Sequence, residues 1–221
     1  MIIKSGALPK ELAAVKALFD EHHQCLPPLK RDTNSYCLDR IGTHNVVATC
    51  LPYKECGFKT AAKVASDIDK TFPTLERIFL VGIGGGIPSK EHNIRLSDVV
   101  VGTGIIQHDI ALLPGYERPQ EDRDRSFEGG FHHEEGQNTC QSCRGPEVIR
   151  ESRTPRPHVH YGIIACGSQV VKDASLRDRI GTETKAICIE IEATGVITAK
   201  RCLVIRGICD YADSHKNDGL A

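Results

Sequence analysis

The sequence predicts an α/β fold, a three-layer α/β/α domain with a mixed central sheet. Continuous apolar runs recur at residues 77–82, 98–102, 161–166 and 202–208, a pattern typical of strands that are buried on both faces. Segments with helical spacing of apolar residues alternate with these runs. The 221 residues are enough for one domain with a sizeable core and few for two, so we expect a single domain over 1–221.

The sequence of the N-terminal half predicts two helices and a pair of strands there. Residues 8–20 and 58–71 place apolar side chains at helical spacing and are rich in alanine. Residues 36–40 and 45–51 look like two strands joined through 41–44, which contain a glycine.

Residues 113–157 break the pattern. They hold five prolines, five glycines and dense mixed charge, without helical or strand period. A structureless stretch of this length is uncommon inside a compact domain. We expect an irregular surface loop there.

Composition excludes several classes of protein. The formal net charge of -1 and an aromatic content of 5% give no support to nucleic-acid binding. No apolar run approaches 18 residues, so no membrane span is expected. The N-terminus does not resemble a signal peptide, and the ten cysteines are scattered, several in apolar runs. We therefore expect free thiols, a cytoplasmic location, a small-molecule ligand and no cofactor.

A glycine run, Val81-Gly-Ile-Gly-Gly-Gly86, follows the first long apolar stretch. It does not fit the dinucleotide-binding motif, because Ile87 stands where the third glycine belongs. Two interpretations are open. The run is a tight turn at a strand end, or it is a bare backbone surface that a sugar, base or anion can approach closely.

Three carboxylates follow buried apolar stretches. Glu190 and Glu192 come after residues 186–189, and Asp210 comes after 202–209. A charge at a buried strand end is costly unless it is paired or functional. A partly desolvated Asp210 would have a raised pKa and could donate a proton near neutral pH. The alternative is that Asp210 caps a helix or pairs with Arg206.

Six segments in order resemble the purine nucleoside phosphorylase and methylthioadenosine nucleosidase superfamily. The similarity is greatest to the nucleosidase-like domain of fungal NOD-like receptor proteins. The segments that carry it are 6–15, 81–89, 94–101, 160–173, 189–193 and 205–216. They span most of the chain apart from 110–157.

The resemblance implies an enzyme that cleaves the N-glycosidic bond of a purine, here adenine, nucleoside or nucleotide. Asp210 matches the general acid that protonates the leaving base, and Glu11 matches the residue that activates water. Glu192 matches the carboxylate that binds ribose hydroxyls. The other implied substrate-binding residues are Glu190 and Ile191, Val170 and Val171 at the base, and Gly82, Ile83, Gly84 and Gly85 on the ribose or anion side. The family usually forms oligomers, so a homo-oligomer is implied as well.

The choice of nucleophile is indicated by two positions. Hexameric phosphorylases carry an arginine and a serine or threonine where this chain has Leu80 and Ile83. Two phosphate ligands are thus missing, and an arginine is hard to replace in that task. We expect hydrolysis, with a phosphate-dependent phosphorylase and a catalytically inactive sensor domain of a larger receptor as alternatives.

The chain departs from the family in two places. No crossover helix is evident between residues 98–102 and 161–166, and the relatives' final helix has no counterpart after residue 216. We expect a truncated copy with part of one sheet face exposed.

Cys140 and Cys143 form a Cys-x-x-Cys motif shortly after His132 and His133. Two histidines and two cysteines could hold a structural zinc ion, which would benefit an irregular segment. The order and spacing fit no standard zinc module, so loop thiols without a metal are the alternative.

Overall fold

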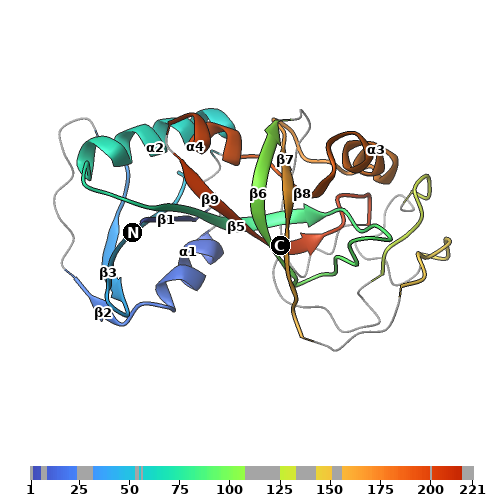
Figure 1. The fold of residues 1–221 in the computed structure, drawn as a ribbon, viewed down its shortest axis with the longest axis horizontal. Coiled ribbons are helices and arrows are strands. Elements are labelled where there is room, and N and C mark those ends of the chain that lie inside the picture. Colours follow the sequence, from blue (N-terminus) through green and yellow to red (C-terminus); the bar gives the residue numbers. More distant parts are fainter. Residues whose placement is uncertain are drawn as a thin grey trace. The chain divides into compact units, whose positions relative to one another are not determined.

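The structure is a computed structural model, shown in Figure 1. It describes residues 2–5, 9–23, 32–52, 55, 57–107, 125–132, 143–150, 156–199 and 201–215. The contacts divide the chain into two compact units. The first unit comprises Met1–Gly82 and Glu192–Ile205, and the second comprises Ile83–Ile191 and Arg206–Ala221. The strands β5 (Ile78–Gly86) and β9 (Cys202–Asp210) each contribute residues to both units.

The first unit contains a mixed sheet. The strands β2 (Glu21–His22), β3 (Cys37–Ile41) and β4 (His44–Thr49) are antiparallel neighbours. The strand β1 (Ile2–Ser5) lies parallel to β4 on one side and to β5 on the other. Val46 and Ala48 of β4 pack against Val15 of helix α1 (Pro9–Lys16) in a small apolar cluster.

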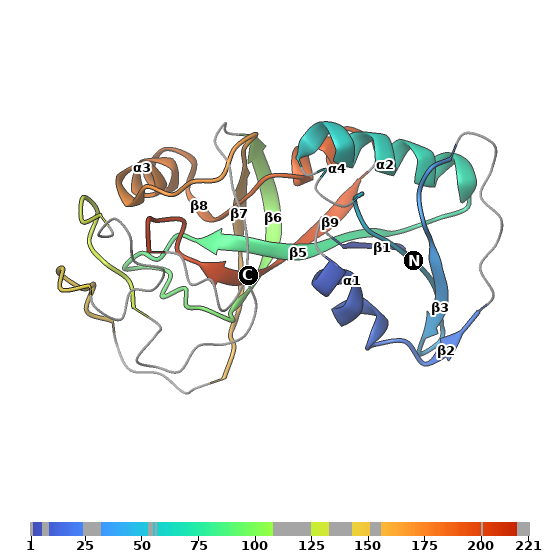
Figure 2. The same ribbon diagram turned by 180° about the vertical axis from the view of Figure 1, so that it is seen from behind.

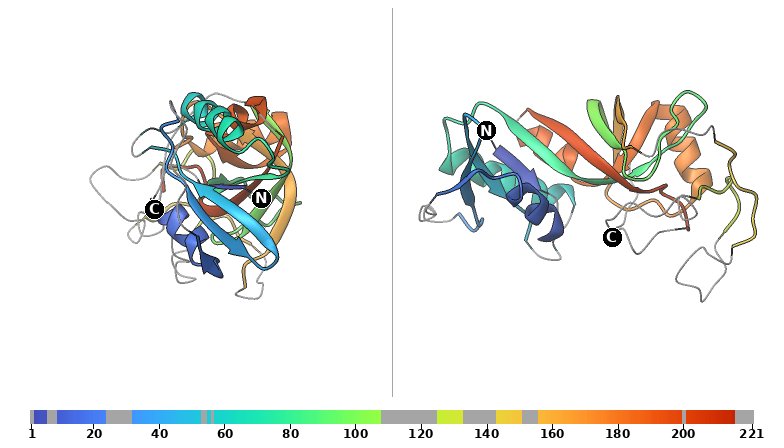
Figure 3. Two further views of the ribbon diagram at one scale, coloured as in Figure 1. Left: turned by 90° about the vertical axis from the view of Figure 1, so that its left-hand side faces the viewer. Right: turned by 90° about the horizontal axis from the view of Figure 1, so that it is seen from below.

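Two helices cover the other face of these strands. Helix α2 (Phe58–Thr71) and helix α4 (Ala193–Ala199) lie side by side, opposite α1 (Figures 1 and 2; Figure 3, left). The buried stripe of α2 consists of Ala61, Val64, Ala65 and Ile68, whose spacing places them on one face. The first unit therefore has helices on both sides of its strands.

Gly195 allows the close approach of α4 to α2. A Cβ atom at this position would lie 1.9 Å from the Phe58 carbonyl oxygen. Because this oxygen belongs to the backbone, a side-chain rotation cannot relieve the clash. We expect Gly195→Ala to lower the free energy of unfolding by about 1–3 kcal/mol, because overpacking outweighs the gain in helix propensity. The matched control is Gly207→Ala, around whose Cβ no described atom lies within 4 Å. Denaturant titration of both variants checks this, and equal stabilities would contradict it.

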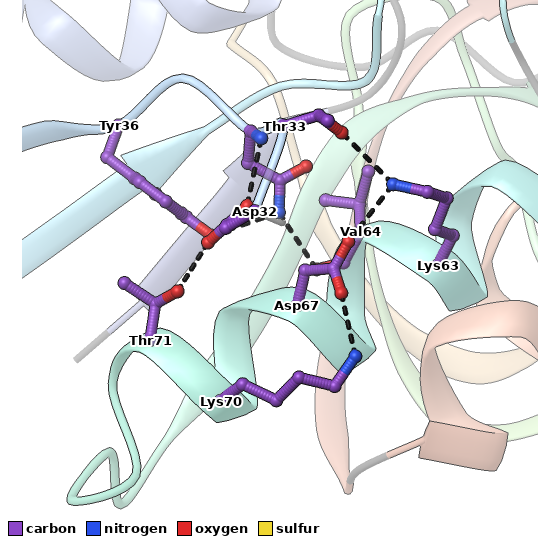
Figure 4. Close-up of polar contacts among 9 residues, drawn as sticks. Asp32, Thr33, Tyr36, Lys63, Val64, Asp67, Lys70 and Thr71 are labelled. Atoms are coloured by element: carbon purple, nitrogen blue, oxygen red, sulfur yellow. Dashed lines mark hydrogen bonds and ion pairs between the residues drawn. The ribbon is translucent and has the colours of Figure 1, made fainter. Parts of the chain in front are cut away.

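The segment before β3 is fixed to α2 by a polar network (Figure 4). Asp32 accepts hydrogen bonds from Thr71, from the Tyr36 hydroxyl at 2.6 Å and from the Asn34 amide at 2.9 Å. Burial opposes ionisation of Asp32, but these hydrogen bonds lower its pKa overall. On the same helix, Lys63 and Lys70 donate to Asp67 and lower its pKa.

The described residues of the second unit form five strands, and the first and the last of them in the sheet order pair with each other. From β5 the order runs through β8 (Ala186–Glu190), β7 (Val159–Cys166) and β6 (Val99–Gln107) to β9, which also pairs with β5. The β5–β8 pair is antiparallel, and the β8–β7 and β7–β6 pairs are parallel. Helix α3 (Ala174–Thr184) contacts β8 and β7.

The predicted fold class is confirmed: the protein is α/β with a mixed sheet. The predicted helix over 58–71 is observed as α2, and the four apolar runs are observed in β5, β6, β7 and β9. The strands β1 and β2 and the helices α3 and α4 were not predicted. The single-domain description stays a prediction.

One expectation needs correction. The turn interpretation of the glycine run is wrong, because β5 continues through Gly86. The description of 113–157 as an irregular surface loop stays a prediction: its described residues form no helix or strand, although a few of them are buried. Phe127 and Glu147 form an antiparallel bridge, and Ser126, Phe127 and Cys143 are buried. Residues 113–124, 133–142 and 151–155 lie outside the described part.

None of the described residues between β6 and β7 is helical. Residues 108–124, 133–142 and 151–155 lie outside the described part, so the absence of a crossover helix stays a prediction. Val159 and Tyr161 of β7 are 55% and 68% exposed, so apolar side chains of this strand face solvent. Within the described residues, no helix combines the length and apolar character that crossing a membrane requires.

Candidate active site

Asp210 is the last residue of β9 and belongs to the second unit. Its side chain is buried, and its Oδ1 accepts a hydrogen bond from the Ala212 amide at 2.7 Å. The Cys209 thiol donates to Oδ2 at 3.4 Å. Ala212 adopts a left-handed backbone conformation (φ 51°), which turns the chain immediately after the carboxylate. Asp210 is therefore held in one orientation at a strand end.

The glycines of β5 lie directly against this strand end. A Cβ on Gly85 would come within 3.0 Å of Asp210 Oδ1 and 2.8 Å of the Ala212 Cβ. A Cβ on Gly84 would come within 2.6 Å of the Cys188 sulfur. The glycines thus have a structural reason, because β5 needs bare backbone to pass this close to Asp210 and β8. The approach of a sugar, base or anion to this backbone stays a prediction.

Glu190 and Arg206 form a buried ion pair inside the second unit. Arg206 donates to Glu190, and their side chains are 2% and 1% exposed. This pair gives Arg206 a partner other than Asp210, which the sequence had left open. It also gives the Glu190 carboxylate a structural task, so a direct contact of Glu190 with substrate stays a prediction.

The two predicted base-pocket residues differ in burial. Val171 packs in an apolar cluster with Ile87, Ile189 and Ala212, whereas Val170 is half-buried. Ala212 follows Asp210 by two residues, so the Val171 cluster contacts the same turn that holds the carboxylate. The half-buried Ile191 follows β8.

Three predicted residues lie in the first unit. Glu11 is half-buried in the first turn of α1, and its charge contributes to the raised pKa of Cys50, whose main cause is burial. Glu192 is buried immediately before α4, and Gly82 is in the middle of β5. Ile83, Gly84, Gly85, Ile191 and Asp210 belong to the second unit.

Arg177 of α3, which the sequence did not single out, holds the segment after Asp210. It donates to the Tyr211 carbonyl at 3.1 Å and forms an ion pair with Asp213 at 3.5 Å. Burial raises the pKa of Asp213, and the nearby positive charge of Arg177 opposes this. The Asp173 side chain accepts from the Leu176 amide and so caps the N-terminus of α3. An aspartate at this position is a typical N-cap, so the start of α3 could have been predicted from the sequence.

A groove of about 970 Å³ lies elsewhere in the second unit. It is formed by the chain after β5, by α3 and by parts of residues 125–132 and 143–150. Among the described residues that line it, none belongs to the predicted site.

The arrangement in the second unit presents one buried, oriented carboxylate beside bare strand backbone. Such a carboxyl group can donate a proton to a leaving group.

The chain belongs to the phosphorylase superfamily, whose family model matches residues 2–220. It is 33% identical to a nucleotide-binding leucine-rich repeat (NLR)-like protein of Hyaloscypha variabilis. That match covers 96% of this chain but 26% of the relative, so the chain spans about a quarter of the relative's length. The match extends over 268 residues, more than the 221 of this chain, so the relative carries segments that this chain lacks.

Solved structures share the fold at low sequence identity. A 5′-methylthioadenosine/S-adenosylhomocysteine nucleosidase from Helicobacter pylori has a TM-score of 0.64 at 18% identity, with 96% of this chain and 86% of that chain covered. The corresponding nucleosidase of S. pneumoniae, bound to a transition-state inhibitor, has a TM-score of 0.62 at 19% identity with the same coverage. Futalosine hydrolase of Helicobacter pylori has a TM-score of 0.64 at 18% identity, with 96% and 85% covered.

Proposed function

We propose that this domain hydrolyses the N-glycosidic bond of an adenine nucleoside or nucleotide, with Asp210 as the general acid. The observation that carries the proposal is the placement of Asp210: buried, oriented by the Ala212 amide, and next to the glycine backbone of β5. Cleavage of this bond has an oxocarbenium-like transition state, so protonation of the departing base lowers the barrier.

The other two catalytic functions are assigned by family position. Glu11 activates the attacking water, and Glu192 holds the ribose hydroxyls. Negative charge near the sugar also stabilises the developing positive charge on its ring. Asp210 protonates the purine at N7, so that the base leaves as a neutral molecule.

Water is the proposed nucleophile because the chain lacks two phosphate ligands. Leu80 is fully buried in β5, and Ile83 is an aliphatic side chain, so neither can bind a phosphate oxygen. Two kinds of structural relative, the methylthioadenosine/S-adenosylhomocysteine nucleosidases and futalosine hydrolase, are hydrolytic by name. The similarity to both supports hydrolysis, and the similarity to nucleosidases named for methylthioadenosine and S-adenosylhomocysteine supports adenine as the base.

The substrate class is tested by chromatography. Purified full chain is incubated with adenosine, 5′-methylthioadenosine and ATP, and free adenine is measured, with inosine and uridine as controls for the base. We expect adenine from at least one of the three adenine compounds and no base release from uridine. Release of no base from any of them by a folded sample would contradict the proposal.

A second candidate function is a ligand-binding sensor domain without catalysis. It is favoured by the NLR-like relative, of which this chain matches about a quarter. This alternative predicts that adenine compounds bind, as measured by calorimetry, while no adenine is released.

A further inference from the structure

The turn that follows Asp210 is buried but contains no glycine. Tyr211, Ala212 and Asp213 are between 1% and 3% exposed. Ala212 has a left-handed backbone conformation (φ 51°), which is unfavourable for a residue with a side chain and persists only where neighbouring groups fix it. The Ala212 amide is also the donor to Asp210 Oδ1, so the groups that fix this turn also orient the carboxylate.

Arg177 of α3 fixes the turn through polar contacts. Its Nη1 donates to the Tyr211 carbonyl oxygen at 3.1 Å and lies 3.5 Å from Asp213 Oδ2. One guanidinium nitrogen therefore contacts the residue before Ala212 and the residue after it. The Arg177 Nε donates to Asp178 Oδ1 at 2.8 Å, which fixes the orientation of the guanidinium plane. Arginine presents its donors in a rigid planar fork, so it can hold such groups at a fixed separation.

Two further contacts hold the same turn. Ile180, which lies one helical turn after Arg177 and so near the same face of α3, belongs to the apolar cluster that contains Ala212. From another segment, Arg150 donates to the Tyr211 hydroxyl, and its guanidinium lies 5.2 Å from the centroid of the Tyr211 ring. The carbonyl and the ring of Tyr211 are thus fixed by two different arginines.

The burial of Arg177 favours a role beyond stability. The side chains of Arg177 and Asp213 are 3% and 2% exposed, and taking two charges out of water costs about as much as their attraction returns. An apolar pair of similar volume often stabilises a fold equally well. An apolar side chain cannot, however, donate a hydrogen bond to the Tyr211 carbonyl and so cannot fix the path of the backbone there.

We propose that Arg177 is a positioning residue for the general acid. It fixes the turn at residues 211–213, so that the Ala212 amide keeps Asp210 in the orientation that delivers its proton to the leaving base. This inference rests on the proposed function of Asp210. Proton transfer is sensitive to small displacements, since a shift of about 1 Å can cost roughly 100-fold in rate.

The test is a double-mutant cycle between Arg177→Met and Asp210→Asn. The kcat of adenine release is measured for the full chain with its best substrate among adenosine, 5′-methylthioadenosine and ATP. Arg177→Met alone should lower kcat about 10- to 100-fold and change KM only a few-fold. In the Asp210→Asn background it should lower kcat by less than about 3-fold, because the proton transfer that it supports is already lost. A purely structural loss would lower kcat by the same factor in both backgrounds.

The matched control is Arg179→Met, which replaces an arginine of the same helix that is 67% exposed and should leave kcat unchanged. Arg177→Lys keeps the proposal testable if Arg177→Met does not fold, because it retains the positive charge beside Asp213. A lysine ammonium cannot reproduce the planar fork, so kcat should still fall by roughly 10-fold. Circular dichroism verifies that each variant is folded.

The outcomes separate this role of Arg177 from the proposed function. A folded Arg177 variant with the wild-type kcat would overturn the positioning role and leave the proposed function intact. So would an equal fall of kcat in the wild-type and Asp210→Asn backgrounds. Wild-type protein that releases no adenine would contradict the proposed function itself, and the role of Arg177 with it.

Discussion

Asp210→Asn is expected to lower the rate of adenine release by about 100- to 10,000-fold, the usual contribution of a general acid. Asparagine has nearly the same shape, and its side-chain oxygen can still accept the hydrogen bond from the Ala212 amide at the Oδ1 position. The turn after β9 should therefore persist. What the variant loses is the transferable proton, so the base would have to leave as an anion.

The kinetic pattern separates this role from a structural one. Because substrate contacts other than the proton transfer remain, kcat should fall while KM changes only a few-fold. The control is Asp69→Asn, which alters an exposed aspartate on α2 and should leave kcat unchanged. An Asp210→Asn variant with more than about a tenth of the wild-type kcat would exclude Asp210 as the acid.

Glu190→Gln is expected to cost about 3–5 kcal/mol of unfolding free energy, because it leaves the Arg206 guanidinium buried without its counter-charge. For a chain of this size, this corresponds to a fall in Tm on the order of 10 °C. The Cys188 thiol nearby has a pKa raised by burial, which indicates how poorly this region solvates charge.

Removing both charges should restore much of the loss. In the double variant Glu190→Leu with Arg206→Met no uncompensated charge is left, and such replacements are often close to neutral. The control Glu183→Gln breaks an exposed pair with Arg179, both 67% exposed, and should change stability by less than about 0.5 kcal/mol. Equal, small effects of Glu190→Gln and Glu183→Gln in urea titrations would refute the structural role of the pair.

The sequence predicts well those elements whose pattern and packing agree. Residues 58–71 have an amphipathic pattern, and the structure buries that stripe in α2. The apolar runs that became β5 and β9 are recognisable because most of their side chains are buried or half-buried. The run of β7 is apolar as well, although Val159 and Tyr161 at its start are exposed.

Helix α4 was not predicted because its local preferences are overridden by tertiary packing. Helix α4 contains Val196, Ile197 and two threonines, which favour strands, and it is helical where Gly195 lets it pack on α2. The glycine run suggested a turn, but contacts with β8 and β9 hold it as a strand.

In the candidate site, too, some features could be predicted from the sequence and others depend on tertiary contacts. Asp210, Glu190 and Glu192 could be found from sequence because each follows a buried apolar stretch. The pairing of Glu190 with Arg206, and of Arg177 with Tyr211, joins residues 16 and 34 positions apart. The spacing of apolar and polar residues along the sequence does not predict such distant contacts, so they are seen only in the folded chain.

The identity of the sugar product tests the central claim, hydrolysis of the glycosidic bond, most directly. Full chain is incubated with its best adenine substrate with and without inorganic phosphate, and both products are quantified by chromatography with mass detection. We expect adenine and a free sugar, in equal amounts and at the same rate in both reactions. Sugar 1-phosphate formed only when phosphate is present, or no adenine in either reaction, would contradict the claim.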